Sequence, residues 1–373
     1  MSRYSDLDTP TRILLGPGPS MVHPRVLRAM AQPLVGHLDP QFIRLMNEVQ
    51  DLLRYVFQTK NQMTIPVSGT GSAGMEAALC NFIEPGDSVV IGVNGYFGER
   101  LCDIAGRYGA QVRRIERPWG QVFDPEEIEA ALKQTPAKLV ALVHAETSTG
   151  ARQPLEGVAD IVHRHGGLLV VDCVTSLGGV PLKIDEWDID IAYSGTQKCL
   201  SCPPGLAPLT VGERGRTALR ARKTKVANWY LDLTMIEAYW GQNRTYHHTA
   251  PISMNYALRE ALRIVEEEGL EKRWERHANN ACELWAGLEA LGLNLIVPAA
   301  YRLPSLTTVS VPEGANEAAI RAALLDQYDV EIAGGLGAFK GKAWRIGLMG
   351  YSSRRENIVV LLGALERLLR GQR

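Results

Sequence analysis

The chain has 373 residues, enough for two or three domains, and its 46% hydrophobic and 22% charged residues are typical of a soluble globular protein. Its formal net charge of −1 gives no electrostatic support for a nucleic-acid or anionic-membrane partner. The sequence contains no apolar run long enough to span a bilayer, and the start, Met1–Asp6, lacks the apolar region of a secretion signal. With six scattered cysteines, the chain fits a reducing, cytoplasmic compartment.

The first part of the chain predicts an N-terminal arm followed by an alternation of helices and strands. Residues 1–22 form the arm, which contains the rigid turn Leu14–Ser20, and helices are expected over 24–33 and 40–58. Further on, strands are predicted at 63–67, 88–93, 111–115, 138–144, 168–172, 190–194 and 206–211, with helices at 72–83, 97–108, 125–135 and 154–165. Strands such as Leu168–Val171 are apolar throughout, so both faces are buried. The pattern predicts an α/β fold with a doubly wound, mainly parallel seven-stranded sheet.

The pattern changes from about residue 255. Two long helices are expected over 252–268 and 271–291, and then strands at 305–311, 329–333 and 343–348 with helices at 316–327 and 354–370. This order is typical of a smaller α+β domain. We place the boundary near residue 270, so that 23–270 form the large domain and 271–373 the small one, with a helical link between them.

A glycine-rich stretch follows the first strand of the sheet. Gly69, Gly71 and Gly74 give the pattern G-x-G-x-x-G between a strand and a helix, which indicates a phosphate site at a helix N-terminus. A dinucleotide would also need a carboxylate at the end of the next strand. That strand ends in Asn94, and Asp87 lies at its other end. The stretch therefore favours a phosphate ligand over NAD, and on its own it is equally well explained as a plain strand–turn–helix joint.

Two charged residues lie at the carboxyl ends of neighbouring predicted strands. Asp172 ends an apolar strand, where an unpaired carboxylate is costly, so we expect it to have a cationic partner. Lys198 lies in a loop of small residues after the next strand. A lysine, a carboxylate and a phosphate site match the aldehyde, the pyridine nitrogen and the phosphate of pyridoxal phosphate. Taken singly, Asp172 is better explained as a structural ion-pair residue and Lys198 as a solvated loop lysine, but together with the phosphate loop the functional interpretation is favoured.

Cys199 and Cys202 form a C-x-x-C pair beside this lysine. A zinc site would need a second pair of ligands, and the sequence has neither a following C-x-x-C nor an H-x-x-x-H. A thioredoxin-like pair would belong at a different strand–helix junction. We interpret them as two unrelated thiols.

Over almost its whole length the chain resembles the class V, fold-type I pyridoxal-phosphate aminotransferases, in the alanine–glyoxylate and serine–glyoxylate (serine–pyruvate) branch. The matching blocks are Leu14–Ser20, Ser68–Gly71, Glu84–Asp87, Ser148–Gly150, Val171–Asp172, Tyr193–Lys198, Tyr246–Thr249, Gly334–Gly337 and Arg345–Gly347. The blocks around Lys198 and Tyr246 carry most weight.

The resemblance implies roles for individual residues. Lys198 would form the Schiff base with the cofactor and move the proton between the substrate Cα and C4′, while Asp172 would hold the pyridinium nitrogen. Phe97 would stack on the ring where relatives often have Trp, and Val174 would pack beneath it. Thr147 would reach the O3′ side. The phosphate would be held by Thr70, Gly71, Ser72 and Gln197.

Three further residues complete the implied site. Arg345 would bind the substrate α-carboxylate. Tyr246 and Thr249 would reach the phosphate in the partner subunit, so the resemblance implies a homodimer with shared active sites. A metal site at the adjacent His247 and His248 is the competing interpretation, but neighbouring side chains of an extended strand point to opposite faces and chelate poorly.

The implied activity is pyridoxal-phosphate-dependent transamination between alanine and glyoxylate, giving pyruvate and glycine. Serine as donor, a serine–pyruvate reaction, or another small substrate is the alternative. A cysteine desulfurase would need a C-terminal cysteine, and none follows Cys282. A pyridoxamine–pyruvate enzyme would need an acidic residue where Thr70 stands. A non-catalytic binding or regulatory protein with this fold is the alternative of a different class, against which Lys198, Asp172 and Arg345 argue.

Overall fold

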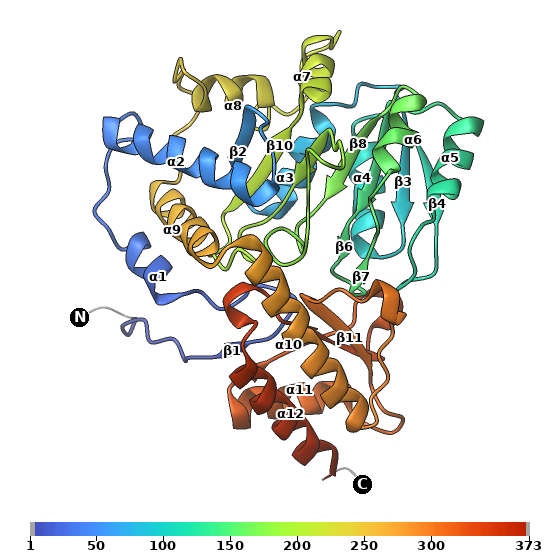
Figure 1. Ribbon diagram of the computed structural model, residues 1–373. Coiled ribbons are helices and arrows are strands. Elements are labelled where there is room, and N and C mark those ends of the chain that lie inside the picture. The colour runs from blue at the N-terminus through green and yellow to red at the C-terminus, as the bar shows by residue number, and fades with distance from the viewer. Residues whose placement is uncertain (1–3, 371–373) are drawn as a thin grey trace.

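The centre of the molecule is a seven-stranded sheet with strand order β2-β10-β9-β8-β5-β3-β4, in a computed structural model that describes residues 4–370 (Figure 1). Its strands are β2 (Met63–Ser68), β3 (Ser88–Val93), β4 (Gln111–Glu116), β5 (Leu139–Val143), β8 (Leu168–Asp172), β9 (Ile191–Tyr193) and β10 (Leu206–Val211). Strand β10 runs antiparallel to both of its neighbours, β2 and β9, and the other pairs of this sheet are parallel. The predicted α/β fold with a mainly parallel seven-stranded sheet is confirmed.

Helices cover both faces of the sheet, and the C-terminal part of the chain lies below it (Figure 1). The helices are α1 (Pro24–Met30), α2 (Pro40–Phe57), α3 (Gly71–Cys80), α4 (Tyr96–Arg107), α5 (Pro125–Gln134), α6 (Val158–Arg164), α7 (Glu213–Arg220), α8 (Leu233–Trp240), α9 (Ile252–Glu268), α10 (Leu270–Ala290), α11 (Glu317–Tyr328) and α12 (Arg355–Arg370). Short 3-10 turns are η1 (Ala299–Tyr301), η2 (Gly337–Phe339) and η3 (Gly350–Ser352). Among the helices of residues 4–370, none combines the length and apolar character that crossing a bilayer requires.

Local sequence explains where several of these helices begin. Asp124 and Glu127 form a capping box at α5, and Pro125 takes the first turn, which needs no amide donor. The helix expected over 154–165 is shorter in the structure, because Gly157 has a positive φ of 76° and α6 begins only after it. Helices α7 and α8 were not predicted.

The C-terminal part has a small antiparallel sheet of its own. Its order is β11-β14-β13, formed by β11 (Leu306–Ser310), β14 (Ala343–Gly347) and β13 (Ala333–Gly334). The strand expected over 329–333 divides, because β12 (Val330–Glu331) pairs in parallel with β1 (Ile13–Leu14) of the arm. Two further short strands, β6 (Ala145–Glu146) and β7 (Ala151–Arg152), pair with each other.

The described chain has two large hydrophobic cores and two smaller clusters that combine residues from both parts of the chain. The first is built from residues between 26 and 270, and the second from Leu15 and residues between 284 and 365. Between α9 and α10 only Gly269 interrupts the helical path, with a φ of 82°. The link is therefore two helices with a one-residue break, while the division into domains at residue 270 stays a prediction.

Candidate active site

Most of the predicted site residues gather at one edge of the central sheet. Asp172 ends β8 and pairs in register with Val143, the last residue of β5, and with Tyr193, the last residue of β9. Because β2 and β9 both run antiparallel to β10, the loop after β2 leaves at this same edge. Ligands of open α/β sheets bind beyond the carboxyl ends of the strands. The fold thus brings the phosphate loop, Asp172 and the loop carrying Lys198 together.

Asp172 is a buried carboxylate that is hydrogen-bonded but not ion-paired. Its Oδ1 accepts from the Val174 amide at 2.9 Å, and its Oδ2 accepts from the Tyr193 hydroxyl at 2.8 Å. Asp172 takes part in none of the ion pairs between residues 4 and 370, so the cationic partner expected from the sequence is not a contacting side chain. Burial raises the pKa of Asp172 to about 6, and the positive charge of Lys198 is among the influences that oppose this rise.

Lys198 is buried in the loop after β9, with 8% of its surface exposed. Its Nζ donates a hydrogen bond to the Pro17 carbonyl of the arm. Burial, and next the charge of Arg345, lowers the pKa of Lys198 to about 8. The arm approaches closely, since a Cβ on Gly18 would lie 2.7 Å from Lys198 Cδ. A buried amine with a lowered pKa is a good nucleophile and base near neutral pH.

The phosphate loop presents free donors at the start of α3. Thr70 precedes the helix in an extended conformation and makes no side-chain capping bond, so the amides of Gly71 and Ser72 remain available to an anion. A Cβ on Gly71 would meet Gly195 Cα at 3.5 Å, so this loop touches the loop that carries Gln197. The Gln197 Oε1 atom is buried without a hydrogen-bond partner. The free amides suit a bound phosphate group, whereas the Gln197 oxygen is an acceptor and lacks a donor.

The residues expected around a cofactor ring come from three different elements. Phe97 is half-buried in the first turn of α4, where its amide donates to Glu146 Oε2 at 3.2 Å. Val174 lies beside the phosphate loop, because a Cβ on Gly71 would be 3.6 Å from its Cγ2. Thr147 is buried, and its hydroxyl shares a hydrogen bond with Thr175.

Arg345 reaches the same site from β14 of the C-terminal sheet. It is 6% exposed, and its guanidinium donates to the carbonyls of Gly334 at 2.9 Å and Thr147 at 3.1 Å. Burial lowers the pKa of Arg345 to about 10. Arg345 also takes part in none of the ion pairs between residues 4 and 370, so its charge is free to meet a carboxylate ligand.

Tyr246 and Thr249 are exposed, and the structure does not bring them into the site of their own chain. Their segment does run past the end of β2, where His248 Nε2 lies 2.6 Å from Ser68 Oγ. The two histidine Nδ1 atoms of His247 and His248 are 2.7 Å apart, so the expectation that the rings point to opposite faces was wrong. Within residues 4–370, His, Cys, Asp and Glu side chains form no group of three that could hold a metal ion.

Three residues at this site were not predicted from the sequence. The Tyr193 phenol binds Asp172, as described above. Glu146 is buried, and burial raises its pKa to about 7, although its carboxylate accepts hydrogen bonds from Ser148 as well as Phe97. Arg100 lies on α4 with Nη1 3.3 Å from Ser72 Oγ. A polar residue one helical turn after Phe97 was the only signal that could have indicated Arg100.

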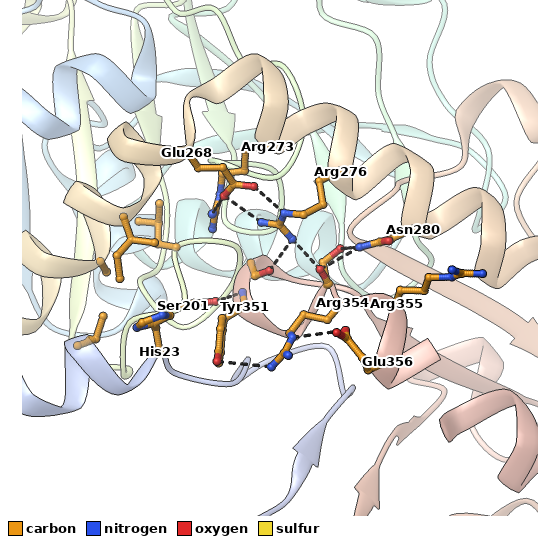
Figure 2. Close-up of a pocket in the computed structure, with 16 residues that line it drawn as sticks. His23, Ser201, Glu268, Arg273, Arg276, Asn280, Tyr351, Arg354, Arg355 and Glu356 are labelled. Carbon is orange, nitrogen blue, oxygen red and sulfur yellow. Dashed lines mark hydrogen bonds and ion pairs between the residues drawn. The ribbon is translucent and has the colours of Figure 1, made fainter. Parts of the chain in front are cut away.

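A cavity of about 450 Å³ lies behind the lysine loop and contains none of the predicted site residues (Figure 2). Its walls include Tyr351, whose amide donates to Ser201 Oγ at 2.7 Å. Ser201 Oγ lies 3.1 Å from Ser20 Oγ, and Ser20 donates to the Lys198 carbonyl at 2.8 Å. The cavity wall thus supports the backbone of the lysine loop.

Comparison with known proteins agrees with this geometry. The sequence model described as aminotransferase class-V matches residues 13–356. The (S)-ureidoglycine–glyoxylate transaminase of Bacillus subtilis (strain 168) is 45% identical, over 99% of this chain and 93% of that protein. The alanine–glyoxylate aminotransferase of Callithrix jacchus is 44% identical, over 97% and 89%. The crystal structure of alanine–glyoxylate aminotransferase from Nostoc sp. is 56% identical with a TM-score of 0.97, over 99% of this chain and 98% of that chain.

Proposed function

This chain belongs to the class V aminotransferase family, and we propose that it transfers the amino group of a small L-amino acid to glyoxylate. It is an aminotransferase of fold type I, and its cofactor is pyridoxal phosphate. In the proposed reaction glyoxylate becomes glycine, while alanine becomes pyruvate. Serine is the alternative donor and would give hydroxypyruvate. The names of the relatives support glyoxylate as the acceptor.

One observation supports the proposal most strongly. Asp172, Lys198 and Arg345 are buried at a single site, and among residues 4–370 none of the three forms an ion pair with an oppositely charged side chain. Burying ionisable groups without partners costs free energy, so their presence together indicates a ligand that supplies the missing partners. We assign the pyridine nitrogen of the cofactor to Asp172, the aldehyde to Lys198 and the substrate carboxylate to Arg345. A non-catalytic protein would have no need of all three.

Lys198 and Arg345 are proposed to have different roles toward the substrate. When bound, pyridoxal phosphate supplies an aldehyde that condenses with amines and a ring that accepts electrons. Arg345 holds the substrate by its carboxylate and so orients its α-carbon toward the lysine. Because its pKa is lowered to about 8, Lys198 Nζ is partly neutral at physiological pH and accepts the proton from that α-carbon. Asp172 stabilises positive charge at the ring nitrogen.

The remaining residues would hold the cofactor in place. Phe97 and Val174 are proposed to contact its ring, and Thr147 its O3′ side. The donors proposed for the phosphate within the chain are Thr70, Gly71, Ser72 and Gln197. The free amides of α3 support this assignment.

We also propose that the enzyme is a homodimer in which Tyr246 and Thr249 reach the phosphate of the partner subunit. Aromatic side chains near them are unusually exposed, with Trp229 at 60%, Tyr230 at 44% and Tyr246 at 58%. Stacking of Trp229 on His247 at 4.6 Å joins this aromatic surface to the Tyr246 segment. Exposed aromatic patches are typical of protein interfaces.

Mixed dimers test whether active sites are shared. A Lys198→Ala subunit and a Tyr246→Ala subunit, each inactive alone, should restore activity when they are co-expressed, because one site of the mixed dimer is then intact. About a quarter of wild-type activity is expected from random pairing of the two subunits. Absence of restored activity in a purified mixed dimer would contradict shared sites.

A cytoplasmic location is proposed on the basis of cysteine chemistry. All six cysteines are free thiols, and Cys80, Cys173, Cys199 and Cys202 are buried. Unpaired thiols are typical of a reducing compartment. Fractionation of cells that express the native chain would test this location, and recovery outside the cytoplasm would contradict it.

The donor and the acceptor are tested by product analysis. Purified enzyme, loaded with pyridoxal phosphate, is given ¹³C-labelled glyoxylate with L-alanine, L-serine or (S)-ureidoglycine, and labelled glycine is measured by mass spectrometry. Alanine is expected to give the highest rate. A higher rate with serine or ureidoglycine would replace the donor, and absence of labelled glycine with all three would refute the proposed function.

A further inference from the structure

The phosphate site assigned above contains no positively charged side chain. A phosphate monoester carries between one and two negative charges at neutral pH. Within one chain its proposed partners are Thr70, Gly71, Ser72 and Gln197, all of them neutral. The N-terminus of α3 supplies only about half a positive charge. A dianion at this site would therefore be under-neutralised by these groups.

Arg100 lies where the missing charge is needed. Its Nη1 is 3.3 Å from the Oγ of Ser72, and its guanidinium carbon is 4.8 Å from the ring centroid of Phe97 and 5.3 Å from that of Tyr96. The guanidinium thus stands between the phosphate loop and the residue proposed to contact the cofactor ring. Arg100 is half-buried on α4.

Arg100 also lacks a carboxylate partner, in contrast to other arginines near it. Arg107, at the far end of the same helix, pairs with Asp103 at 3.0 Å, and Arg114 pairs with Glu99 at 2.6 Å. Arg100 takes part in none of the ion pairs formed among residues 4–370. Its charge nevertheless acts on the site, since it is among the influences that lower the pKa of both Asp172 and Lys198.

We infer that Arg100 is a ligand of the cofactor phosphate and supplies the positive charge of that site. A guanidinium binds phosphate through charge-assisted hydrogen bonds and can keep its stacking on an aromatic ring at the same time. Arg100 would thereby connect the phosphate loop to the Phe97 side of the ring pocket. The inference rests on the proposed assignment of the cofactor site. The competing explanation is that Arg100 only packs on Phe97 and Tyr96.

The two explanations are separated by comparing pyridoxal phosphate with pyridoxal, which has the same ring and no phosphate. The cofactor-free protein is titrated with each compound, and the dissociation constant is measured by quenching of tryptophan fluorescence. In Arg100→Gln, affinity for pyridoxal phosphate should fall by about 10- to 100-fold, the usual worth of a charged hydrogen bond. Affinity for pyridoxal should change by less than about threefold, since the lost partner is absent from it.

Two further variants complete the experiment. Arg100→Lys keeps the charge but loses the planar stacking group, so affinity for pyridoxal phosphate should stay closer to wild type than in the glutamine variant. Arg107→Gln, on the same helix, is the matched control and should bind both compounds normally. Thermal unfolding of each cofactor-free variant checks that the fold is retained.

Equal losses for the two compounds, or an unchanged affinity for pyridoxal phosphate in Arg100→Gln, would overturn the inference. Loss of affinity in the lysine variant as large as in the glutamine variant would overturn it as well, because stacking would then be the feature that matters. Failure of the wild-type protein to bind pyridoxal phosphate is a different result, and it would refute the proposed function itself.

Discussion

Replacing Asp172 by asparagine should stabilise the cofactor-free protein and weaken its binding of the cofactor. Burial raises the pKa of Asp172 from 3.8 to about 6. Because the pKa is higher in the folded state than in the unfolded state, the free energy of unfolding falls as the pH rises from the unfolded-state pKa to the folded-state pKa. At pH values above 6 this cost reaches about 3 kcal/mol, at about 1.4 kcal/mol for each pKa unit. Asparagine has nearly the same shape and carries no charge, so the variant avoids the cost.

The hydrogen bonds of Asp172 can survive this change. The asparagine oxygen can accept from the Val174 amide, as Asp172 Oδ1 does at 2.9 Å. The amide nitrogen then faces the Tyr193 hydroxyl, which can rotate to accept a hydrogen bond instead of donating one. The main change in the free energy of unfolding is therefore the removal of a buried charge.

Urea unfolding of the cofactor-free protein at pH 5 and pH 8 measures the effect. The variant's advantage over wild type should be about 1.4 kcal/mol larger at pH 8 than at pH 5, because wild-type Asp172 is mostly protonated at the lower pH. Asp103→Asn, an exposed residue bonded to Arg107, is the control and should show no such difference. Added pyridoxal phosphate should stabilise wild type more than Asp172→Asn. An equal advantage at both pH values would refute the reasoning.

Three further variants test other parts of the site. Arg345→Lys should lower kcat/KM by about 100-fold, mainly through a higher KM for the amino acid, because lysine cannot form a bidentate contact with a carboxylate. An unchanged KM in steady-state kinetics would argue against this role. Gly18→Ala should reduce the free energy of unfolding by about 1–3 kcal/mol, since φ is 104° and its Cβ would meet the buried lysine side chain. Gly314→Ala shares the positive φ, at 80°, but has open space around it, so in the same urea titration it should cost about 1 kcal/mol, less than Gly18→Ala. Tyr193→Phe should raise the pKa of Asp172 further, so the loss of stability with rising pH should extend to higher pH, and an unaltered pH profile would contradict the importance of this hydrogen bond.

The sheet and the centre of the site were predictable because both depend on local patterns. Most strands of the sheet are short apolar runs between turn residues, although the edge strand β4 is largely polar, and parallel strands end at one edge. Asp172 and Lys198 follow strands that are consecutive in sequence and were therefore expected at this edge, and the pairing of β8 with β9 brings them together. The phosphate loop joined them because its strand ends at that edge too. The roles of the individual site residues were inferred from the resemblance to the family, and they stay predictions.

What the sequence did not indicate depends on contacts between distant segments. Pairing of β1 with β12 joins the arm to the C-terminal part across more than 300 residues, and no local pattern encodes it. Tyr193 and Glu146 look like ordinary strand residues until packing places their side chains beside Asp172 and Phe97. The residues 245–249 were expected to behave as an extended strand, but they form a loop in which neighbouring rings can meet.

The most direct test of the central claim is the visible absorbance of the enzyme loaded with pyridoxal phosphate. The protein should be yellow, L-alanine should bleach the yellow band, and glyoxylate should restore it with release of glycine. Lys198→Ala should have an altered spectrum and show no such cycle. A wild-type protein that stays colourless with pyridoxal phosphate, or a yellow band that neither alanine nor serine changes, would contradict the assignment of this chain as a glyoxylate-dependent aminotransferase.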